Sequence, residues 1–250
     1  MAKTMFYYLI AILSVHIAYA QQSVSYFNKV YGNNETFRLA QVVRPLNNGY
    51  IVMGGYSIVG EEGLYISRLN NQGEELWYKK LDSLPSSSPY WMVIYNGSYV
   101  IQANDGNFIV YYEKIEDIVL CKIDTLGGVV WRKIYEKPYD QGVYQVIQTT
   151  DGGYAMAGLT SNNTAALSDT TWAYLLKVGP TGQFQWERTY ESHNDARFYS
   201  VQQWWDGTYI MGGIAWNGTD YDMWVVKTAA NGDTVWTKAL GEAYNDWECN

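Results

Sequence analysis

The sequence predicts an all-β protein, a β-propeller built from four-stranded antiparallel blades, and three observations support this prediction. An eighteen-residue pattern recurs four times without a gap: an apolar run, a polar turn that ends in glycine, and a second run that carries tryptophan. A second pattern, centred on an Asn-Gly or Asp-Gly turn, alternates with the first. Together the two patterns form a unit of about fifty residues, a length typical of propeller blades.

The first pattern predicts a β-hairpin that ends each blade. Its four copies are LYISRLNNQGEELWYKKL (64–81), IVLCKIDTLGGVVWRKIY (118–135), AYLLKVGPTGQFQWERTY (173–190) and MWVVKTAANGDTVWTKAL (223–240). Their tryptophans stand at one strand position, as Trp77, Trp131, Trp186 and Trp236. Because this position repeats and an indole buries roughly 150–250 Å², we expect each of them to fill the space between neighbouring blades.

The second pattern predicts the hairpin that opens each blade. Its copies span 37–56, 90–103, 143–160 and 198–215, and in each a tight turn precedes a strand that begins at Tyr50, Tyr99, Tyr154 or Tyr209. Asn-Gly and Asp-Gly turns between apolar runs favour hairpins because these residues tolerate positive φ. With this alignment, length varies only in the connection between the second and third strands of a blade.

The expected blades cover about 37–81, 90–135, 143–190 and 198–240, with a partial blade at each end. Residues 25–32 match the last strand of a blade, with Phe27 at the tryptophan position, and residues 244–250 match the start of a further blade. The sequence therefore predicts an incomplete ring, a fragment of a longer one. The alternative is an open array of four blades with an exposed edge, which soluble proteins usually avoid.

The N-terminal twenty residues have the features of a cleaved secretory signal. Lys3 precedes an apolar run from Met5 to Ala18, and Ala18-Tyr19-Ala20 has the small-x-small form of a signal peptidase site. The run is shorter than the roughly 20 apolar residues of a membrane anchor. We therefore expect residues 1–20 to engage the export machinery, and residues 21–250 to form a propeller domain without a membrane span. After periplasmic transit this domain would be secreted, extracellular or at the cell surface.

The charge balance disfavours nucleic acid as a partner. The chain carries 17 Lys and Arg against 25 Asp and Glu, a net charge of −8, and it has no basic cluster that could bind a phosphate backbone. The two cysteines, Cys121 and Cys249, stand at different places in non-adjacent repeats. Free thiols are the first expectation for them, and a disulfide or an intermolecular bridge is the alternative.

The sequence offers little for catalysis, metal binding or cofactor binding. One of its two histidines lies in the expected signal, so only His193 remains for a metal site or a catalytic triad. The glycine-rich turns lack the lysine and the helix of a phosphate-binding loop. We therefore predict no catalytic residue, no metal and no cofactor.

Ligand binding is expected in the connections at one end of the blades. In a four-stranded meander, the two hairpin turns lie at one end, and the other connections lie at the opposite end. Function on a fixed scaffold usually concentrates in the variable connections. The candidate binding residues at that end are Tyr112, Glu113, Asp140, His193, Trp216, Asp220 and Tyr244.

This mixture of aromatic, amide and acidic side chains favours a function in binding. Our first hypothesis is a non-enzymatic secreted or surface propeller that presents its loops to a glycan, a peptide or a protein partner. The alternative is a carbohydrate-active enzyme, a glycoside hydrolase or lyase, that pairs Glu113 with Asp140 or Asp220, since glycosidases use two carboxylates roughly 5–10 Å apart. A structural spacer domain is a third hypothesis.

A family resemblance is carried by two segments, KIDTLGGVVWRKIY (122–135) and TTDGGYAMAG (149–158). They are similar to the propeller-type repeats of secreted and surface proteins of Bacteroidetes, many of which end in a sorting domain for type IX secretion. A looser similarity is to the tryptophan-docked repeats of quinoprotein-like propellers, although the turn before Trp131 is one residue shorter here. The resemblance implies a propeller fold and an extracellular location, and it implies no established activity.

Overall fold

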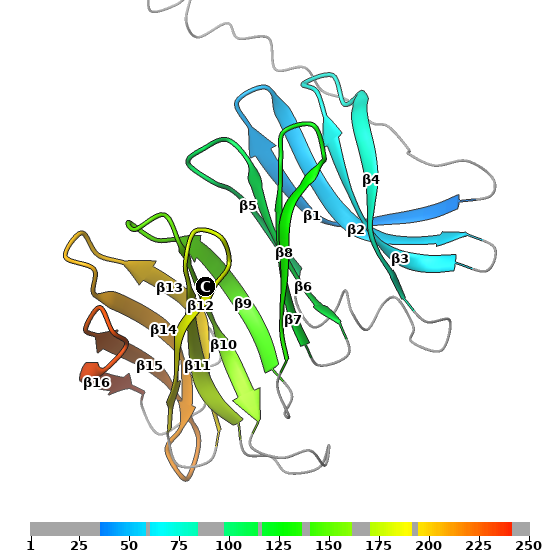
Figure 1. Cartoon of the computed structure of the whole chain (residues 1–250). Helices are drawn as coiled ribbons and strands as arrows, with labels where there is room; N and C mark the ends of the chain where they lie inside the picture. Colours follow the sequence, from blue (N-terminus) through cyan, green and yellow to red (C-terminus); the bar gives the residue numbers. More distant parts are fainter. Residues whose placement is uncertain are drawn as a thin grey trace, which may run out of the picture.

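The computed structural model describes residues 36–58, 61–84, 98–114, 117–136, 141–161, 171–191 and 195–241. These residues form sixteen strands and no helix. The strands make up four antiparallel sheets, each a meander of four consecutive strands (Figure 1). The all-β fold class and the four-stranded blades are therefore confirmed. The described residues contain no helix that could span a bilayer. The expected signal (1–20) and the partial blades (25–32 and 244–250) lie outside the described residues.

Each blade consists of four strands that follow one another in the sequence. The first blade holds β1 (Thr36–Leu46), β2 (Gly49–Ile58), β3 (Glu61–Leu69) and β4 (Glu75–Leu84), and the second holds β5 (Ser98–Gln102), β6 (Phe108–Lys114), β7 (Asp117–Ile123) and β8 (Val129–Tyr135). The third holds β9 (Gln141–Gln148), β10 (Tyr154–Ser161), β11 (Thr171–Val178) and β12 (Phe184–Tyr190), and the fourth holds β13 (Ala196–Gln203), β14 (Tyr209–Trp216), β15 (Tyr221–Thr228) and β16 (Thr234–Leu240).

The blades stand side by side, and their first strands contact one another in the order β1, β5, β9 and β13. The first strands therefore lie innermost and the tryptophan-bearing strands outermost (Figure 1). The hairpin turns of every blade project from one end, which we call the turn end. The connections between second and third strands, and between blades, lie at the opposite end, which we call the loop end.

The predicted alignment of the second blade is wrong by one strand. Tyr99 lies in β5, the first described strand of that sheet, and β6 begins at Phe108. The turn between them contains Gly106, which has a φ of 84° and donates its amide hydrogen to Ala103 O. Two Asn-Gly or Asp-Gly pairs precede the strands of this blade, and the sequence alone does not show which of them closes the hairpin. Phe108 is therefore the counterpart of Tyr154, and Tyr112 belongs to a strand.

Glycine closes the outer hairpins because the turn requires a left-handed residue. In the second blade, Gly127 has a φ of 85°, and Asp124 Oδ1 accepts hydrogen bonds from the amides of Leu126 and Gly128. Asp and Asn stabilise such turns by bonding the backbone two residues on. The polar run before each tryptophan therefore encodes a rigid turn.

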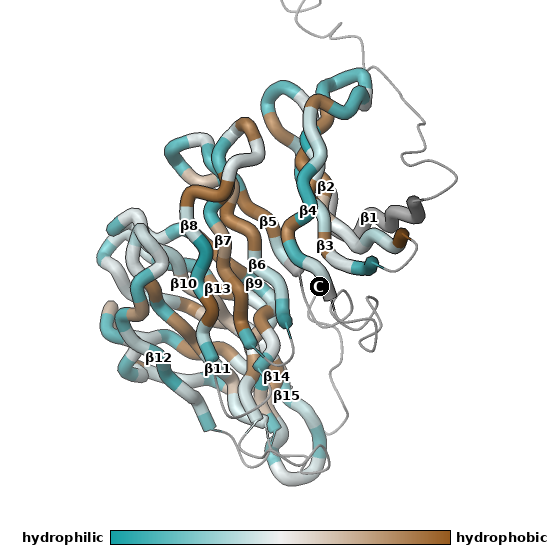
Figure 2. The backbone as a smooth tube through the Cα atoms, turned by 45° about the vertical axis from the view of Figure 1, so that its right-hand side comes forward, coloured by the Kyte–Doolittle hydropathy of each residue, from teal (hydrophilic) through white to brown (hydrophobic). Residues whose placement is uncertain are grey.

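Three hydrophobic clusters hold the blades together, each between two consecutive blades. Ile51, Met53, Leu64 and Ile66 of the first blade are fully buried against the second blade, where Phe108 and Val110 lie in the same cluster. Figure 2 shows hydrophobic residues along the strands and hydrophilic ones in the connections at the turn end. Burial of both faces of a sheet explains the almost continuous apolar runs of the second and third strands.

Each of three tryptophans lies between its own blade and the next one. The ring centroid of Trp77 is 6.4 Å from that of Phe108, Trp131 is 6.1 Å from Tyr154, and Trp186 is 5.9 Å from Tyr209. Trp77 Nε1 also donates a hydrogen bond to Thr125 O of the second blade, at 2.9 Å. Trp236 stands at the same position of the last described blade, and 43% of its surface is exposed.

The turn glycine of each following blade lies directly under the tryptophan. A Cβ added to Gly182 would approach Lys133 Cγ to 2.7 Å and the ring of Trp131 to 2.9 Å. Gly127 lies in the same way under Trp77 and Lys79. These glycines are therefore required twice, for the positive φ of the turn and for the close approach of the indole.

Burial of tyrosines makes the fold sensitive to alkaline pH. Desolvation, reinforced by a hydrogen bond to Asp195, raises the pKa of Tyr221 to about 12, and burial raises the pKa of Tyr112 and Tyr174 further. Unfolded tyrosines titrate near pH 10. Above that pH the unfolded chain releases protons that the folded chain retains, so we expect the free energy of unfolding to fall steadily as pH rises from 10 to 12.

Thermal unfolding at several alkaline pH values, together with tyrosinate absorbance, measures this effect. Tyrosine ionisation should coincide with loss of the folded signal. Complete ionisation at pH 10 in a chain that remains folded would contradict the expectation.

Candidate functional site

Two of the predicted binding residues, Tyr112 and Glu113, lie in strand β6 and not in a loop. Consecutive strand residues point to opposite faces, so Tyr112 faces the first blade, where its hydroxyl donates to Asp82 Oδ2 at 3.2 Å. Glu113 faces the third blade and accepts a 2.5 Å hydrogen bond from Tyr111. Both side chains are buried. Tyr112 joins two blades through Asp82, and Glu113 accepts a hydrogen bond from Tyr111, whose hydroxyl accepts one from the Val143 amide of the third blade. Ligand contact by Tyr112 or Glu113 stays a prediction.

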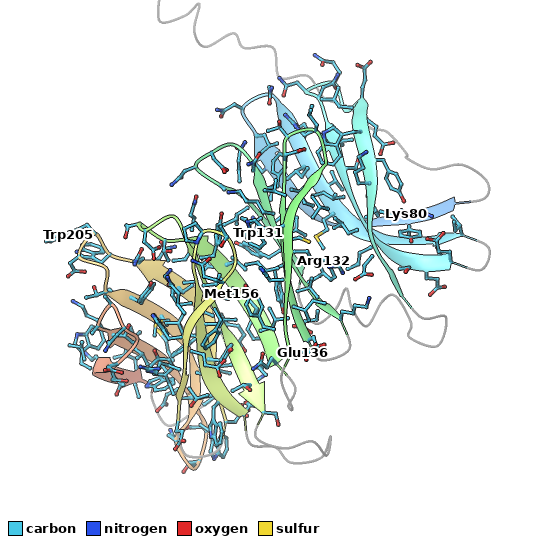
Figure 3. All side chains as sticks on the ribbon, in the orientation of Figure 1. Lys80, Trp131, Arg132, Glu136, Met156 and Trp205 are labelled. Carbon is cyan, nitrogen blue, oxygen red and sulfur yellow. The ribbon has the colours of Figure 1, made fainter. Side chains whose placement is uncertain are left out.

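Asp82 anchors the first of these contacts. Its carboxylate accepts hydrogen bonds from Lys114 Nζ at 3.0 Å and from Arg132 Nη2, and the Arg132 guanidinium lies 5.6 Å from the ring centroid of Tyr112. Figure 3 labels Arg132 on β8, next to the first blade. These ion pairs connect β4 to β6 and β8, and they occupy the carboxylate of Asp82 with structural contacts.

Trp216 and Asp220 lie together at the loop end of the fourth blade, at the connection between β14 and β15. The side chain of Asn217 donates to Asp220 Oδ1 and to Asp222 Oδ2, which closes this connection into a compact turn. The ring of Trp216 meets the ring of Tyr221 edge-on, with centroids 5.0 Å apart. The other three predicted residues, Asp140, His193 and Tyr244, lie outside the described residues.

The carboxylate of Asp195 connects the third and fourth blades at the loop end. It directly precedes β13, and its carboxylate accepts hydrogen bonds from Tyr221 at 2.5 Å, from Arg197 at 2.6 Å and from Thr171 of the third blade. Its backbone carbonyl accepts a hydrogen bond from the amide of Trp216 at 2.7 Å. Asp195 therefore fixes β11, β13 and β15 relative to one another.

Two exposed tyrosines lie beside this carboxylate on the innermost strands. The ring centroids of Tyr144 on β9 and Tyr199 on β13 are 5.0 Å apart, and the two residues are 36% and 39% exposed. Most other tyrosines of the described residues are buried, for example Tyr154 and Tyr209. The exposure of Tyr144 and Tyr199 therefore sets them apart from the buried tyrosines of the other strands.

A β-bulge brings each of the two tyrosines out of the ladder. The pairing register of β13 shifts between Phe198 and Ser200, and the register of β9 shifts opposite Gly158, so that Tyr199 and Tyr144 are the extra residues. Bulges often redirect a side chain next to a functional site. Glycine is needed opposite the bulge: a Cβ on Gly213 would overlap the carbonyl of Arg197.

Arg197 connects the tyrosine pair to Asp195. Burial disfavours its charged form, but the Asp195 carboxylate, and the nearby Tyr199 and Tyr144, outweigh this effect and raise the pKa of the guanidinium. Its Nε is buried and has no hydrogen-bond partner in the part of the chain that the structure describes. We name Tyr144, Tyr199, Arg197, Asp195 and Trp216 the inner loop-end cluster.

The sequence did not single out the two tyrosines or Arg197. A signal was present: Tyr144 and Tyr199 occupy one position of the repeat, and each faces a strand with glycine, Gly158 or Gly213, at the matching position. Exposure of these tyrosines could not be predicted without knowing where the bulges are. A strand pattern in which residues alternate between the two faces does not show a bulge. Within the described residues, no group of His, Cys, Asp and Glu could hold a metal ion.

Comparison with known proteins gives matches only among solved structures. No family model and no curated protein matches the chain. A GH43 β1,3-galactosidase is 12% identical with a TM-score of 0.44, over 79% of this chain and 44% of that chain. A putative exo-β-1,3-galactanase from Bifidobacterium bifidum is 13% identical with a TM-score of 0.41, over 79% and 69%. A mannose phosphorylase from Leishmania mexicana is 14% identical with a TM-score of 0.39, over 70% and 63%.

This chain thus spans less than half the length of the GH43 structure. All three TM-scores are below 0.5, so the fold assignment rests on the sheets and their packing.

Proposed function

We propose that this chain recognises carbohydrate, and that a neutral glycan binds at the inner loop-end cluster. The exposed tyrosine pair carries this proposal: two rings 5.0 Å apart and inclined by 59° offer two apolar faces midway along the innermost strands β9 and β13. Aromatic rings combine a large apolar surface with a polar edge, which suits the faces and hydroxyls of a sugar ring.

Polar groups around the tyrosine pair would fix the orientation of a bound sugar through hydrogen bonds. The guanidinium side chain of Arg197, 27% exposed, is a hydrogen-bond donor beside the two rings, and Trp216 adds a third, half-buried aromatic side chain at the loop end. Ligand sites typically combine aromatic surface with a few fixed polar groups. Arg197 is held in place by Asp195, so the donor is preorganised before a ligand arrives.

The contacts of the described carboxylates favour binding without catalysis. Asp82, Glu113 and Asp195 each accept hydrogen bonds from neighbouring side chains, which commits them to structural contacts. We also propose secretion, on the basis of the signal features of residues 1–20, and an origin in Bacteroidetes with type IX export, on the basis of the sequence resemblance.

The binding proposal predicts the effect of removing one ring. Tyr199→Ala should weaken glycan binding at least about tenfold, a loss of about 1.4 kcal/mol, because the sugar would lose one of its two aromatic contacts. A glycan array would identify the ligand, and isothermal titration calorimetry would give the dissociation constants of the wild type and of the variant.

Trp205→Ala is the matched control. Trp205 is 82% exposed at the tip of the β13–β14 turn, at the opposite end of the same blade (Figure 3). This substitution removes an even more accessible aromatic ring and should leave the dissociation constant unchanged. No binding to any glycan, or an equal loss in Trp205→Ala, would contradict the proposed site.

A carbohydrate-active enzyme is the second candidate function. One observation favours it: the Asp195 side chain is 13% exposed next to the tyrosine pair, and Asp220 lies in the adjoining β14–β15 connection. Two such acids could act as acid and base or nucleophile at a glycosidic bond. Hydrolysis of an array-positive glycan by the wild type, and its loss in Asp220→Asn with binding retained, would establish this function; binding without turnover would exclude it.

A further inference from the structure

The turn between β13 and β14 carries two neighbouring exposed tryptophans. Trp204 is 53% exposed and Trp205 is 82% exposed, and Figure 3 labels Trp205 at the tip of this turn. Both residues lie at the turn end of the fourth blade, opposite to the inner loop-end cluster. Exposed aromatic surface of this kind marks an interaction site more often than it serves the fold.

The turn does not need tryptophan for its own structure. The Trp204 amide donates to Thr208 O at 2.7 Å, and the Gly207 amide donates to Trp204 O at 2.9 Å. The third blade closes its β9–β10 turn with the same two bonds at Thr149, and the second blade closes its β5–β6 turn with them at Ala103. Thr149 and Ala103 are small and buried. The tryptophans therefore add exposed surface to a turn that other blades build from small residues.

The exposure of Trp205 does not result from its place in the last described blade. Its counterparts in the second and third blades, Asn104 and Thr150, are also exposed. Each of them nevertheless has a blade packed beside it, because their amides donate to the side chains of Gln148 and Gln203 in the following blade, at 2.7 and 2.8 Å. Exposure is therefore a property of this turn position.

Carboxylates accompany the two tryptophans. Asp206 follows them in the same turn, and hydrogen bonds from the Thr208 hydroxyl and amide lower its pKa, so its charge is present at neutral pH. The neighbouring β15–β16 turn is in contact, since a Cβ on Gly207 would lie 3.3 Å from Ala230 Cβ. That turn ends in Asp233, whose side chain is 63% exposed.

The hairpin turns of all four blades have one sign of charge. They contain no lysine or arginine, and their acidic residues are Glu74, Asp105, Asp124, Asp151, Asp206 and Asp233. Lys122 and Lys177, which pair with Asp105 and Asp151, are mostly buried beneath half-exposed carboxylates. Arg188, the partner of Asp233, lies on the outermost strand β12. Such a surface repels anionic membranes and attracts a basic partner.

We propose that the turn patch, made of Trp204, Trp205, Asp206, Ala230 and Asp233, docks a protein partner whose surface has an apolar pocket inside a basic rim. Tryptophan is among the commonest anchors of protein interfaces, and its indole would fill the pocket. The carboxylates would pair with lysine or arginine at the rim. This site lies at the opposite end of the blade from the proposed glycan site, so the two ligands do not compete.

A display library of short random peptides, selected on the whole chain, tests this docking. The selected peptides should combine lysine or arginine with apolar residues. Fluorescence anisotropy of a labelled peptide then gives the dissociation constants. Trp205→Ala should weaken binding at least about tenfold, because a buried tryptophan anchor typically contributes that much.

Asp206→Asn tests the contribution of charge. Asparagine keeps the oxygen that accepts the hydrogen bonds of Thr208, so the turn is retained and only the charge is lost. This variant should bind the peptide about threefold more weakly at low salt and like the wild type at about 1 M salt, where charges are screened.

Trp236→Ala is the matched control, because it removes a partly exposed indole from the outermost strand of the same blade and should leave peptide affinity unchanged. Selection of acidic peptides, or of none, would overturn the proposal, and so would an equal loss in Trp236→Ala. A dimer that Trp205→Ala abolishes would assign the patch to a second copy. Binding to phosphatidylcholine–phosphatidylglycerol vesicles that depends on Trp205 would assign it to a membrane. Either result would also overturn the proposal.

Discussion

Trp186→Ala is expected to lower the free energy of unfolding by about 3 kcal/mol, whereas Trp236→Ala should lower it by less than about 1 kcal/mol. The two residues occupy the same position of the repeat. The ring of Trp186 meets Tyr209 edge-on at 5.9 Å and lies over Gly232 of the fourth blade, so its removal leaves a cavity between blades. Trp236 is 43% exposed, so its removal changes mainly solvent contacts.

Urea titration of both variants, followed by circular dichroism, measures the difference. Each variant serves as the control for the other, because both lose an indole from an outermost strand. Equal losses in the two variants would show that the indole stabilises its own hairpin and not the contact between blades.

Gly213→Ala should destabilise the chain by about 3 kcal/mol or prevent folding. Its Cβ would overlap the backbone carbonyl of Arg197, and a backbone atom cannot rotate away as a side chain can. The overlap occurs at the bulge that exposes Tyr199, so a variant that folds should also bind the glycan more weakly.

The neighbouring Gly212→Ala is the matched control for this substitution. A Cβ there would meet only the hydroxyl oxygen of Ser200, at 3.0 Å, which can turn aside. Thermal melts should therefore show a large loss for Gly213→Ala and a small one for Gly212→Ala. Similar melting temperatures in the two variants would mean that the bulge is not a fixed part of the fold.

The fold class followed from the sequence because its strongest signals are local. A turn such as Asp124 to Gly128 is closed by contacts within five residues, and the same turn recurs in every blade. Repetition then revealed which apolar positions face another sheet. Where two turn signals compete, as before β5 and before β6, local patterns do not decide, and the second blade was misaligned.

The candidate site was less predictable because it depends on contacts between distant strands. Trp216 and Asp220 were predicted in a connection at the loop end; Asp220 lies in the β14–β15 connection, and Trp216 is the last residue of β14. Tyr112 and Glu113 followed the misaligned strand and lie in the core. The tyrosine pair is positioned by the bulges, and Arg197 is positioned by Asp195, which joins strands of two blades.

The tryptophan contacts all run in one direction along the chain. Trp77, Trp131 and Trp186 each rest on the blade that follows, never on the one before. During synthesis, the N-terminal part of a chain emerges first, so every newly made sheet would shield the indole left bare by its predecessor. The sheets would then pack one after another during synthesis, and the indole on the outermost strand of the newest sheet would stay uncovered until the next sheet forms.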